Sequence, residues 1–509
     1  MKFPQDLLWG SASSDFQYEG GFGLDGRGPI TADYCTDGTA TTPRMMTYVL
    51  PDGTTGETPM RTSMPKGAVG AVQPGKYYPS HQAVDFYHHY KEDIKLLADM
   101  GLNCMRFSIC WGRIFPTGIE DEPNQKGLDF YEAVVDECKK YNMEPLITIC
   151  HDEIPAYIAE HYQGWMWRGS IDCYLKLCKA LFERLGSKVK YWLTFNEINV
   201  LSGYSHVGTT DSSIPATYQC AHNMFVASAK AVKMGKEMMP GAQFSTMYAS
   251  SPVYPRTCKP EDVWAQLCIH RRTLFYIDVM CRGEYPAWQW KYFEEEGVEL
   301  ITEPDDFKVL KEGTLDFISF SMYRSTTCTP HSKLHMHVLA FDTNPYLALT
   351  QWGWSIDPMG MRYVLNEYWD RYQKPLFIVE NGLGMLDEPD ENNYIEDDYR
   401  IEYLKDHFNE IRKAVELDGI PVMGYTMWGG IDLVSLGTGE MKKRYGWIYV
   451  DMDDKGNGSL KRYPKKSYYW MKEFLQTKGA NLDRELYEEV PYANLTQEAR
   501  EVVEFDPPY

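Results

Sequence analysis

Two glutamates near the ends of apolar runs could do chemistry together. Glu197 follows "KYWLTFN" (190–196), and Glu380 lies near the end of "PLFIVEN" (375–381). Two carboxyl groups that face each other across a pocket suit hydrolysis of a glycosidic bond, because one can donate a proton while the other attacks the anomeric carbon or activates water. Neighbouring carboxylates also resist joint ionisation, so one of them keeps its proton near neutral pH. The alternative is that both glutamates are structural ion-pair partners.

Other polar and aromatic residues accompany similar apolar runs. Arg106 could keep one carboxylate ionised, and Tyr323 could hold the same carboxylate through its hydroxyl. Uncharged partners for sugar hydroxyls and an aromatic platform for a sugar ring are supplied by Gln17, His151, Asn196 and Trp428. Each polar residue could instead simply terminate a strand, but their joint occurrence at strand ends favours an active site.

The elements that must position these residues are eight apolar, β-rich runs with helical patterns between them. The runs are 7–13, 104–110, 145–151, 190–196, 243–249, 315–321, 375–381 and 421–428. Nearly continuous apolar runs are typical of parallel strands buried on both faces. Strands that alternate with helices, such as those expected at 81–101 and 128–143, predict a (β/α)8 TIM barrel of the α/β class. Its active site would lie at the C-terminal ends of the strands.

The chain organisation expected from this pattern is a single barrel domain over residues 1–478. Long, turn-rich insertions follow the first strand (20–80) and the sixth strand (326–350). An acidic extension of unknown role covers residues 479–509.

The net charge excludes several classes of partner. The value of -21 argues against nucleic acid and against an anionic membrane surface.

The sequence also predicts the location of the protein. The N-terminus lacks the apolar core of a signal peptide, and the 12 cysteines are scattered without a C-x-x-C pair, so we expect a cytoplasmic protein with buried free thiols. We expect no cofactor, because "GFGLDG" (21–26) is not set between a strand and a helix. We also expect no metal, because the neighbouring residues of "HDE" (151–153) would point to opposite faces of a strand.

Several long motifs resemble those of glycoside hydrolase family 1. "YWLTFNEIN" is similar to its T-F-N-E motif and "LFIVENG" to its E-N-G motif, and "MRFSICWGRIFP" and "GYTMWGGID" are further matches, over about residues 3–475. The resemblance implies a retaining double displacement with Glu380 as the nucleophile and Glu197 as the acid/base. The two carboxyl groups should then lie ~5 Å apart. It further implies that Asn196 binds the 2-hydroxyl and that the glycone pocket is lined by Gln17, His151 and Trp428.

A second set of residues resembles the 6-phospho-β-glucosidases of this family. In "WGGIDLVSL", Ser435 stands where glucosidases for unphosphorylated sugars carry a glutamate that binds the 4- and 6-hydroxyls, and Lys443 and Tyr445 follow at the subfamily spacing. A serine, a lysine and a tyrosine could bind phosphate, whereas a glutamate would repel it. The alternative is that the basic run "KKR" (442–444) is an ordinary solvated loop. Trp352 resembles the tryptophan on the aglycone side of family members.

These observations predict a 6-phospho-β-glucosidase whose substrate is a small phosphorylated β-glucoside, such as phosphorylated cellobiose or an aryl β-glucoside, and whose sugar product is glucose 6-phosphate. Leu436, where phosphogalactosidase relatives carry tryptophan, favours the gluco configuration. The alternatives are a glycosidase for unphosphorylated β-glucosides or β-galactosides and a non-catalytic sugar-phosphate sensor. Asp152 departs from the family, which carries an aromatic residue there, and it leaves the substrate range open. The sequence is compatible with a homo-oligomer.

Overall fold

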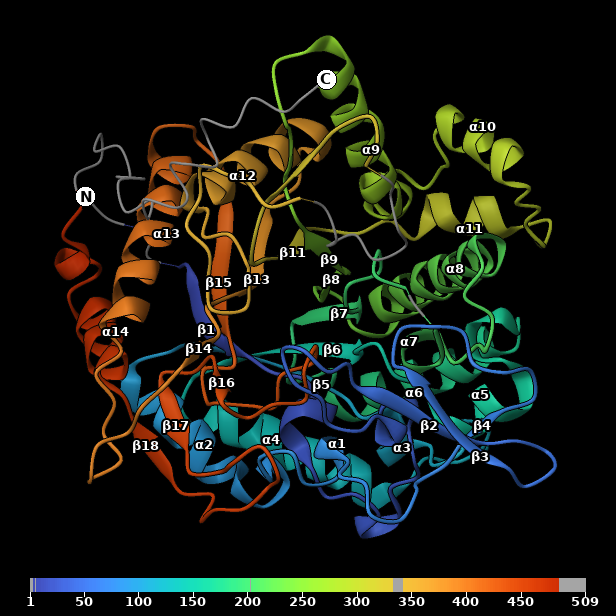
Figure 1. The fold of residues 1–509 in the computed structure, drawn as a ribbon, viewed down its shortest axis with the longest axis horizontal. Coiled ribbons are helices and arrows are strands. Elements are labelled where there is room, and N and C mark those ends of the chain that lie inside the picture. The colour runs from blue at the N-terminus through green and yellow to red at the C-terminus, as the bar shows by residue number, and fades with distance from the viewer. Residues whose placement is uncertain (1–2, 5, 202, 333–341, 485–509) are drawn as a thin grey trace.

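A parallel β-barrel forms the centre of the molecule, and helices surround it (Figure 1). The structure is a computed structural model that describes residues 1–509 except 1–2, 5, 202, 333–341 and 485–509. In the order of pairing, the barrel strands are β8 (Gln243–Ser245), β7 (Tyr191–Phe195), β6 (Glu144–Cys150), β5 (Cys104–Ser108), β1 (Leu8–Ala12), β15 (Val422–Trp428), β13 (Leu376–Asn381), β11 (Ile318–Met322) and β9 (Met247–Ser250). The predicted (β/α)8 barrel is therefore confirmed.

The barrel closes where its fifth strand is interrupted. β8 and β9 are the two halves of the predicted run 243–249, and only Thr246 separates them. β8 pairs with β7, whereas β9 pairs with β11, so the strand changes partner at this residue. The Ser319 hydroxyl donates to the Thr246 carbonyl (2.9 Å), and the Thr246 hydroxyl donates to the Phe195 carbonyl (3.3 Å). These side chains supply hydrogen bonds that the backbone ladder cannot make at the break.

A layer of apolar side chains fills the barrel below the predicted site. Cys104, Leu146, Leu193, Phe377 and Val379 belong to one buried cluster. Arg106 and Thr148 follow Cys104 and Leu146 by two residues, so they point to the same side of the sheet, one layer nearer the C-terminal mouth. The packed apolar layer thus lies beneath the polar side chains of the mouth.

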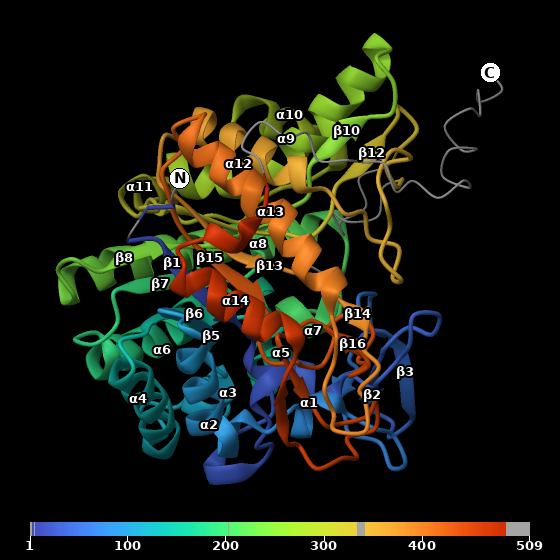
Figure 2. The ribbon, with the colours of Figure 1, turned by 90° about the vertical axis from the view of Figure 1, so that its left-hand side faces the viewer.

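The helices pack around the barrel in nearly sequential order. Contacts join α2 to α4, α4 to α6 and α6 to α8, and α13 packs between α12 and α14, which in turn contacts α2. Figure 2 shows α13 and α14 side by side. Their bounds are α2 (Phe86–Met100), α4 (Gln125–Lys140), α6 (Ser170–Leu185), α8 (Ile214–Met238), α12 (Pro358–Tyr372), α13 (Asp398–Glu416) and α14 (Lys466–Gln476).

The first predicted helix is shorter than the sequence pattern indicates. In place of one helix over 81–101, a single turn, α1 (Pro79–Gln82), precedes α2. Ala83 and Asp85 between them have positive φ angles of 46° and 58°, which a right-handed α-helix does not contain. Gly101 caps α2 as predicted, with φ of 105° and its N–H donating to the Ala98 carbonyl.

The insertions form structure at the mouth of the barrel. The first contains a small antiparallel sheet of β2 (Met45–Val49), β3 (Thr55–Pro59) and β4 (Val69–Gly70). In the second, β12 (Thr326–Cys328) pairs with β10 (Val253–Pro255), and residues 333–341 lie outside the described residues. Most of the predicted C-terminal extension, residues 485–509, also lies outside them. No helix in the part of the chain that the structure describes is long and apolar enough to cross a membrane, and ten of the twelve cysteines are buried free thiols.

Candidate active site

The predicted site residues lie at the C-terminal ends of the barrel strands. Asn196 and Glu197 directly follow β7, Tyr323 directly follows β11, Glu380 lies in β13, and Trp428 is the last residue of β15. Parallel strands of a closed barrel bring their C-terminal ends to one mouth, so these residues gather there although they are far apart in sequence.

Glu380 is held at both of its carboxylate oxygens. Arg106 Nη1 donates to Oε1, and the Tyr323 hydroxyl donates to Oε2 over 2.8 Å. Burial raises the pKa of Glu380 above its ordinary value, while the charge of Arg106 and both hydrogen bonds oppose that rise. Since both contacts stabilise the ionised form, this carboxylate suits a nucleophile.

Glu197 has a different environment. Its Oε1 accepts a hydrogen bond from the Ser321 hydroxyl (3.0 Å). Burial, and then the negative charge of Glu380, raise the pKa of Glu197 to about 8. Glu197 therefore holds a proton at neutral pH and can donate it to a leaving oxygen. The contrast between an ion-paired carboxylate and a protonated one matches the two roles in glycoside hydrolysis.

Arg106 connects Glu380, the predicted nucleophile, to Asn196, a predicted glycone residue. Its Nη2 donates to Asn196 Oδ1 (2.7 Å), and its Nε donates to Thr148 Oγ1 (3.1 Å). The side chain of Arg106 is fully buried. A buried guanidinium needs partners for its N–H groups, so these contacts also set the orientation of Glu380 and Asn196.

Gln17, His151 and Trp428 complete the predicted glycone residues. Gln17 lies in the short helical turn Asp15–Glu19, where its Oε1 accepts from the Ser14 hydroxyl (2.8 Å) and its Nε2 donates to the Val434 carbonyl (2.7 Å). The His151 ring packs near Trp428, with ring centroids 5.9 Å apart. Burial, and then the charge of Arg106, keep the pKa of His151 well below its ordinary value, so the ring is neutral. A neutral ring can both donate to and accept from a sugar hydroxyl.

The basic run 442–444 separates into three different environments. Lys442 is exposed and pairs with Glu440 (2.6 Å). Arg444 turns away from the site and donates to the carbonyls of Val450 (2.9 Å) and Met452 (2.6 Å). Lys443 is buried, and its ammonium lies among several aromatic rings. The solvated-loop interpretation is thus correct for Lys442 only.

Three aromatic rings surround the Lys443 ammonium. Its Nζ lies 4.2 Å from the ring centroid of Trp354, 5.2 Å from that of Trp352 and 5.6 Å from that of Tyr445. Cation–π contacts of this kind hold the ammonium without neutralising it. Among the described residues no carboxylate forms an ion pair with Lys443. The charge therefore remains available to an anion.

Ser435 contributes a hydroxyl in the same loop. Its side chain is buried, and its Oγ has no hydrogen-bond partner within the described part of the chain. A buried hydroxyl without a partner is costly unless a ligand or water satisfies it. Ser435 makes no direct hydrogen bond to Lys443 or Tyr445, whereas Lys443 and Tyr445 touch each other.

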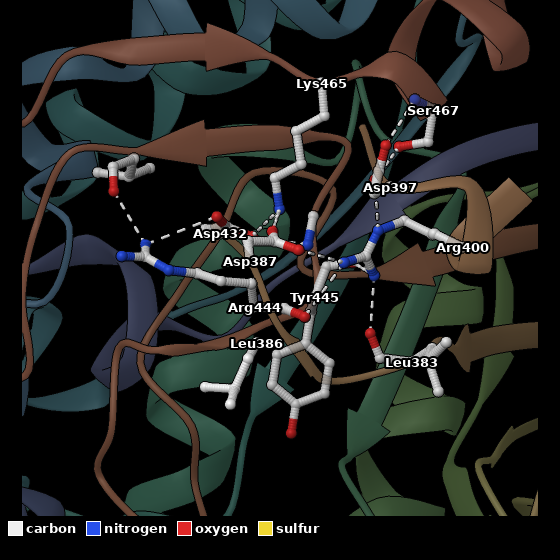
Figure 3. A network of polar contacts seen from close by, with 12 residues as sticks. Leu383, Leu386, Asp387, Asp397, Arg400, Asp432, Arg444, Tyr445, Lys465 and Ser467 are labelled. Atoms are coloured by element: carbon white, nitrogen blue, oxygen red, sulfur yellow. Dashed lines mark hydrogen bonds and ion pairs between the residues drawn. The ribbon is translucent and has the colours of Figure 1, made fainter. Parts of the chain in front are cut away.

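A buried ionic network supports the loop that carries Lys443 and Tyr445 (Figure 3). Arg400 donates to the carbonyls of Leu383 (2.7 Å) and Tyr445 (2.6 Å). Lys465 bridges Asp387 (2.5 Å) and Asp432 (2.9 Å). The charged members are the cations Arg400, Arg444 and Lys465 and the anions Asp387, Asp397 and Asp432.

The same network reaches the backbone of the loop. Asp432 Oδ1 accepts from the Gly446 N–H (2.8 Å), and Arg400 donates to the Arg444 carbonyl (3.3 Å) as well as to that of Tyr445. Lys443 and Arg444 form β16 (Lys443–Arg444), which pairs with β14 (Met385–Leu386). Buried charged side chains thus form hydrogen bonds to the main chain on both sides of Tyr445 and hold it in place.

Sequence reasoning missed three parts of this arrangement. Trp354 joins Lys443 to Tyr323, because its ring lies 5.6 Å from the Tyr323 ring. The available signal was a second tryptophan only two residues from Trp352; a turn with Gly353 at φ of 72° lies between them, and both rings lie beside Lys443. Ser321 precedes Tyr323 by two residues and could have been found in the same way. The network of Arg400, Asp432 and Lys465 had no local signal, because its members come from distant segments.

The pKa of Glu197 generates a prediction about pH. Because donation requires the protonated form, we expect kcat/KM to hold up to about pH 8 and to fall as the pH rises through the pKa of about 8. On the acid side activity should rise as Glu380 ionises. A pH profile of kcat/KM on an aryl glycoside substrate measures both limbs, and a plateau that continues to about pH 10 would contradict the assignment.

The buried network generates a prediction about stability. Asp432→Ala removes a fully buried carboxylate and leaves the charges of Lys465 and Arg444 without full compensation, so we expect the free energy of unfolding to fall by about 3 kcal/mol. Thermal unfolding monitored by circular dichroism measures the change. Asp121→Ala is the control, since that side chain is 98% exposed and its ion pair should contribute little. Equal unfolding temperatures for the two variants would show that the network is not important for stability.

Comparisons with known proteins agree with this geometry. The family model described as glycosyl hydrolase family 1 matches residues 1–48 and 71–480. A 6-phospho-β-glucosidase of Dickeya chrysanthemi is 45% identical over 489 residues, covering 95% of this chain and 99% of the relative. An aryl-phospho-β-D-glucosidase of Bacillus subtilis is 43% identical over 497 residues, with 94% and 99% covered. The solved family 1 β-glucosidase from Thermotoga maritima aligns with a TM-score of 0.77 at 28% identity, covering 94% of this chain and 98% of that one. The chain belongs to glycosyl hydrolase family 1.

Proposed function

We propose that this chain is a retaining 6-phospho-β-glucosidase, which cleaves 6-phospho-β-D-glucosides to glucose 6-phosphate and the aglycone. The observation that carries the proposal is the Lys443 ammonium, which is buried among three rings and has no carboxylate partner among the described residues. Relatives named 6-phospho-β-glucosidase and phospho-cellobiase, each about 44–45% identical, support it. Phosphorylated substrates arise inside cells, so we propose a cytoplasmic location.

The phosphate site consists of Ser435, Lys443 and Tyr445. The ammonium supplies a charge, and the two hydroxyls supply directed hydrogen bonds to the phosphate oxygens. The rings of Trp352 and Trp354 lie beside the Lys443 ammonium, and we assign Trp352 to the aglycone side of the site. Gln17, His151, Asn196 and Trp428 hold the glycone above the two glutamates.

The reaction proceeds in two displacements. Glu380 attacks the anomeric carbon while Glu197 gives its proton to the leaving oxygen, and the product is a covalent glycosyl-enzyme and the free aglycone. Glu197, now ionised, takes a proton from water, which attacks the same carbon and releases Glu380. Arg106 and Tyr323 stabilise the Glu380 carboxylate before attack and after release. Two inversions leave the β configuration unchanged.

A glycosidase for unphosphorylated β-glucosides is the second candidate. Asp152 favours it, because this buried carboxylate could accept a hydrogen bond from a sugar hydroxyl and adds negative charge near the site. The Thermotoga maritima β-glucosidase has the same fold. In such an enzyme, however, the buried Lys443 ammonium would have no anionic partner.

Substrate discrimination tests the proposal directly. We expect p-nitrophenyl β-D-glucoside 6-phosphate to be hydrolysed far more efficiently than p-nitrophenyl β-D-glucoside. Lys443→Met should lower kcat/KM on the phosphorylated substrate about 30-fold, through loss of a contact worth about 2 kcal/mol, and should leave the unphosphorylated substrate unaffected. Lys442→Met, which removes the exposed neighbouring lysine, is the matched control and should change neither value. Equal wild-type efficiency on both substrates would refute the phosphate specificity.

The assignment of the nucleophile has its own test. Glu380→Ala should lower kcat roughly 10⁴-fold because no covalent intermediate can form, whereas Glu388→Ala, an exposed glutamate of the same loop region, should keep wild-type activity. Proton NMR of the wild-type reaction should show the β-anomer of the sugar as the first product. Near-normal kcat in Glu380→Ala, or the α-anomer as the first product, would contradict the double displacement.

A further inference from the structure

Asp152 is a buried carboxylate that the two displacements do not use. It follows His151 beyond the end of β6, and its backbone has φ of 75°, in the left-handed region. Its Oδ1 accepts a hydrogen bond from Asn196 Nδ2 (3.2 Å), and its Oδ2 lies 3.7 Å from His206 Nε2. Only 7% of its side chain is exposed. Burying a carboxylate costs free energy of folding, so a buried carboxylate beside a predicted glycone residue indicates a function.

The contacts of Asn196 reveal that role. The amide oxygen of Asn196 accepts from Arg106 Nη2, and one amide N–H donates to Asp152. If the amide were flipped, its NH2 group would face the guanidinium and its oxygen would face the carboxylate, and both contacts would be lost. One amide N–H of Asn196 is then left to donate to a ligand.

We propose that Asp152 is a positioning residue that locks the amide of Asn196 as a hydrogen-bond donor to the 2-hydroxyl of the glycone. The proposal rests on the proposed function for the place of the sugar. Asp152 and Arg106 hold the two ends of the amide, so a chain of contacts runs from Asp152 through Asn196 and Arg106 to Glu380. Asp152 does not touch the reacting atoms.

The charge of Asp152 also acts on the catalytic acid. Together with burial and Glu380, the Asp152 charge raises the pKa of Glu197. Burial raises the pKa of Asp152 itself to about 7, while the Asn196 hydrogen bond and Arg61 oppose that rise, so Asp152 is ionised above neutral pH. The titratable and charged groups around it in the described part of the chain are Arg61, Arg106, Cys150, His151, Glu153, Glu197, His206 and Glu380. Removal of the Asp152 charge should therefore lower the pKa of Glu197.

Two variants separate these effects. Asp152→Ala removes the acceptor, and we expect kcat/KM on p-nitrophenyl β-D-glucoside 6-phosphate to fall about tenfold. On the corresponding 2-deoxy substrate the loss should be less than about twofold, because that sugar offers no 2-hydroxyl to Asn196. Asp152→Asn keeps an acceptor oxygen but no charge, so it should retain most activity while the alkaline limb of its pH profile moves about 0.5 to 1 pH unit lower.

Three controls make the test decisive. In an Asn196→Ala background, Asp152→Ala should have little further effect, because the two residues act through one contact. Asp121→Ala, an exposed aspartate on the surface, should match the wild type in every assay. Thermal unfolding establishes that each variant is folded. If Asp152→Ala does not fold, Asp152→Leu, which is close to aspartate in size and offers no acceptor, gives the same comparison of the normal and 2-deoxy substrates.

Several results would overturn the proposal. Equal losses on the normal and 2-deoxy substrates would show that Asp152 does not act through Asn196, and additive losses in the double variant would show the same. An unchanged alkaline limb in Asp152→Asn would refute the effect of the Asp152 charge on the pKa of Glu197.

Failure of the proposed function is distinguishable from these outcomes. If the wild type prefers unphosphorylated glucosides, the same comparison runs with the unphosphorylated 2-hydroxy and 2-deoxy pair, and the Asp152 test keeps its meaning.

Discussion

The buried guanidinium of Arg106 is the interaction on which the arrangement of the site depends. A charge without solvent must be satisfied by fixed partners, and Arg106 finds them in Glu380, Asn196 and Thr148. These residues belong to or follow three other strands of the barrel, so one side chain ties together parts of the mouth that are far apart in sequence. The barrel therefore has its polar residues cross-linked at the mouth and its apolar layer packed below.

The two glutamates obtain different properties from one shared environment. Both are buried, and burial raises the pKa of each. Of the two glutamates, Arg106 contacts only Glu380, so the negative charge is favoured there, and that charge in turn discourages ionisation of Glu197. A small asymmetry in contacts thereby distinguishes the proposed nucleophile, Glu380, from the proposed acid, Glu197. Asp152 acts on the same group of residues. Its charge raises the pKa of Glu197, and its carboxylate accepts a hydrogen bond from Asn196.

The proposed phosphate site also depends on how a buried charge is satisfied. Lys443 keeps its charge free for a ligand because aromatic rings surround it instead of carboxylates. The buried ionic network that supports this loop is different, because its cations are paired with aspartates. It therefore needs no further anion. The buried network holds the loop rigid, and the Lys443 ammonium has no carboxylate partner among the described residues. Together these two features favour an ordered anion site.

The sequence alone determined the barrel, the placement of the site residues at its C-terminal mouth and the family, because long apolar runs and contiguous motifs are local properties of the chain. Its resemblance to the 6-phospho-β-glucosidases also predicted Lys443, with Ser435 and Tyr445, as phosphate-binding residues. Only the tertiary structure decided which cation of the basic run 442–444 turns inwards, because Lys442 and Arg444 find partners in distant segments. The same holds for the break before α2, for Trp354 beside Lys443 and for the contact between Asp152 and Asn196. Each of these features depends on contacts between residues that are distant in sequence, and a local sequence pattern does not predict such contacts.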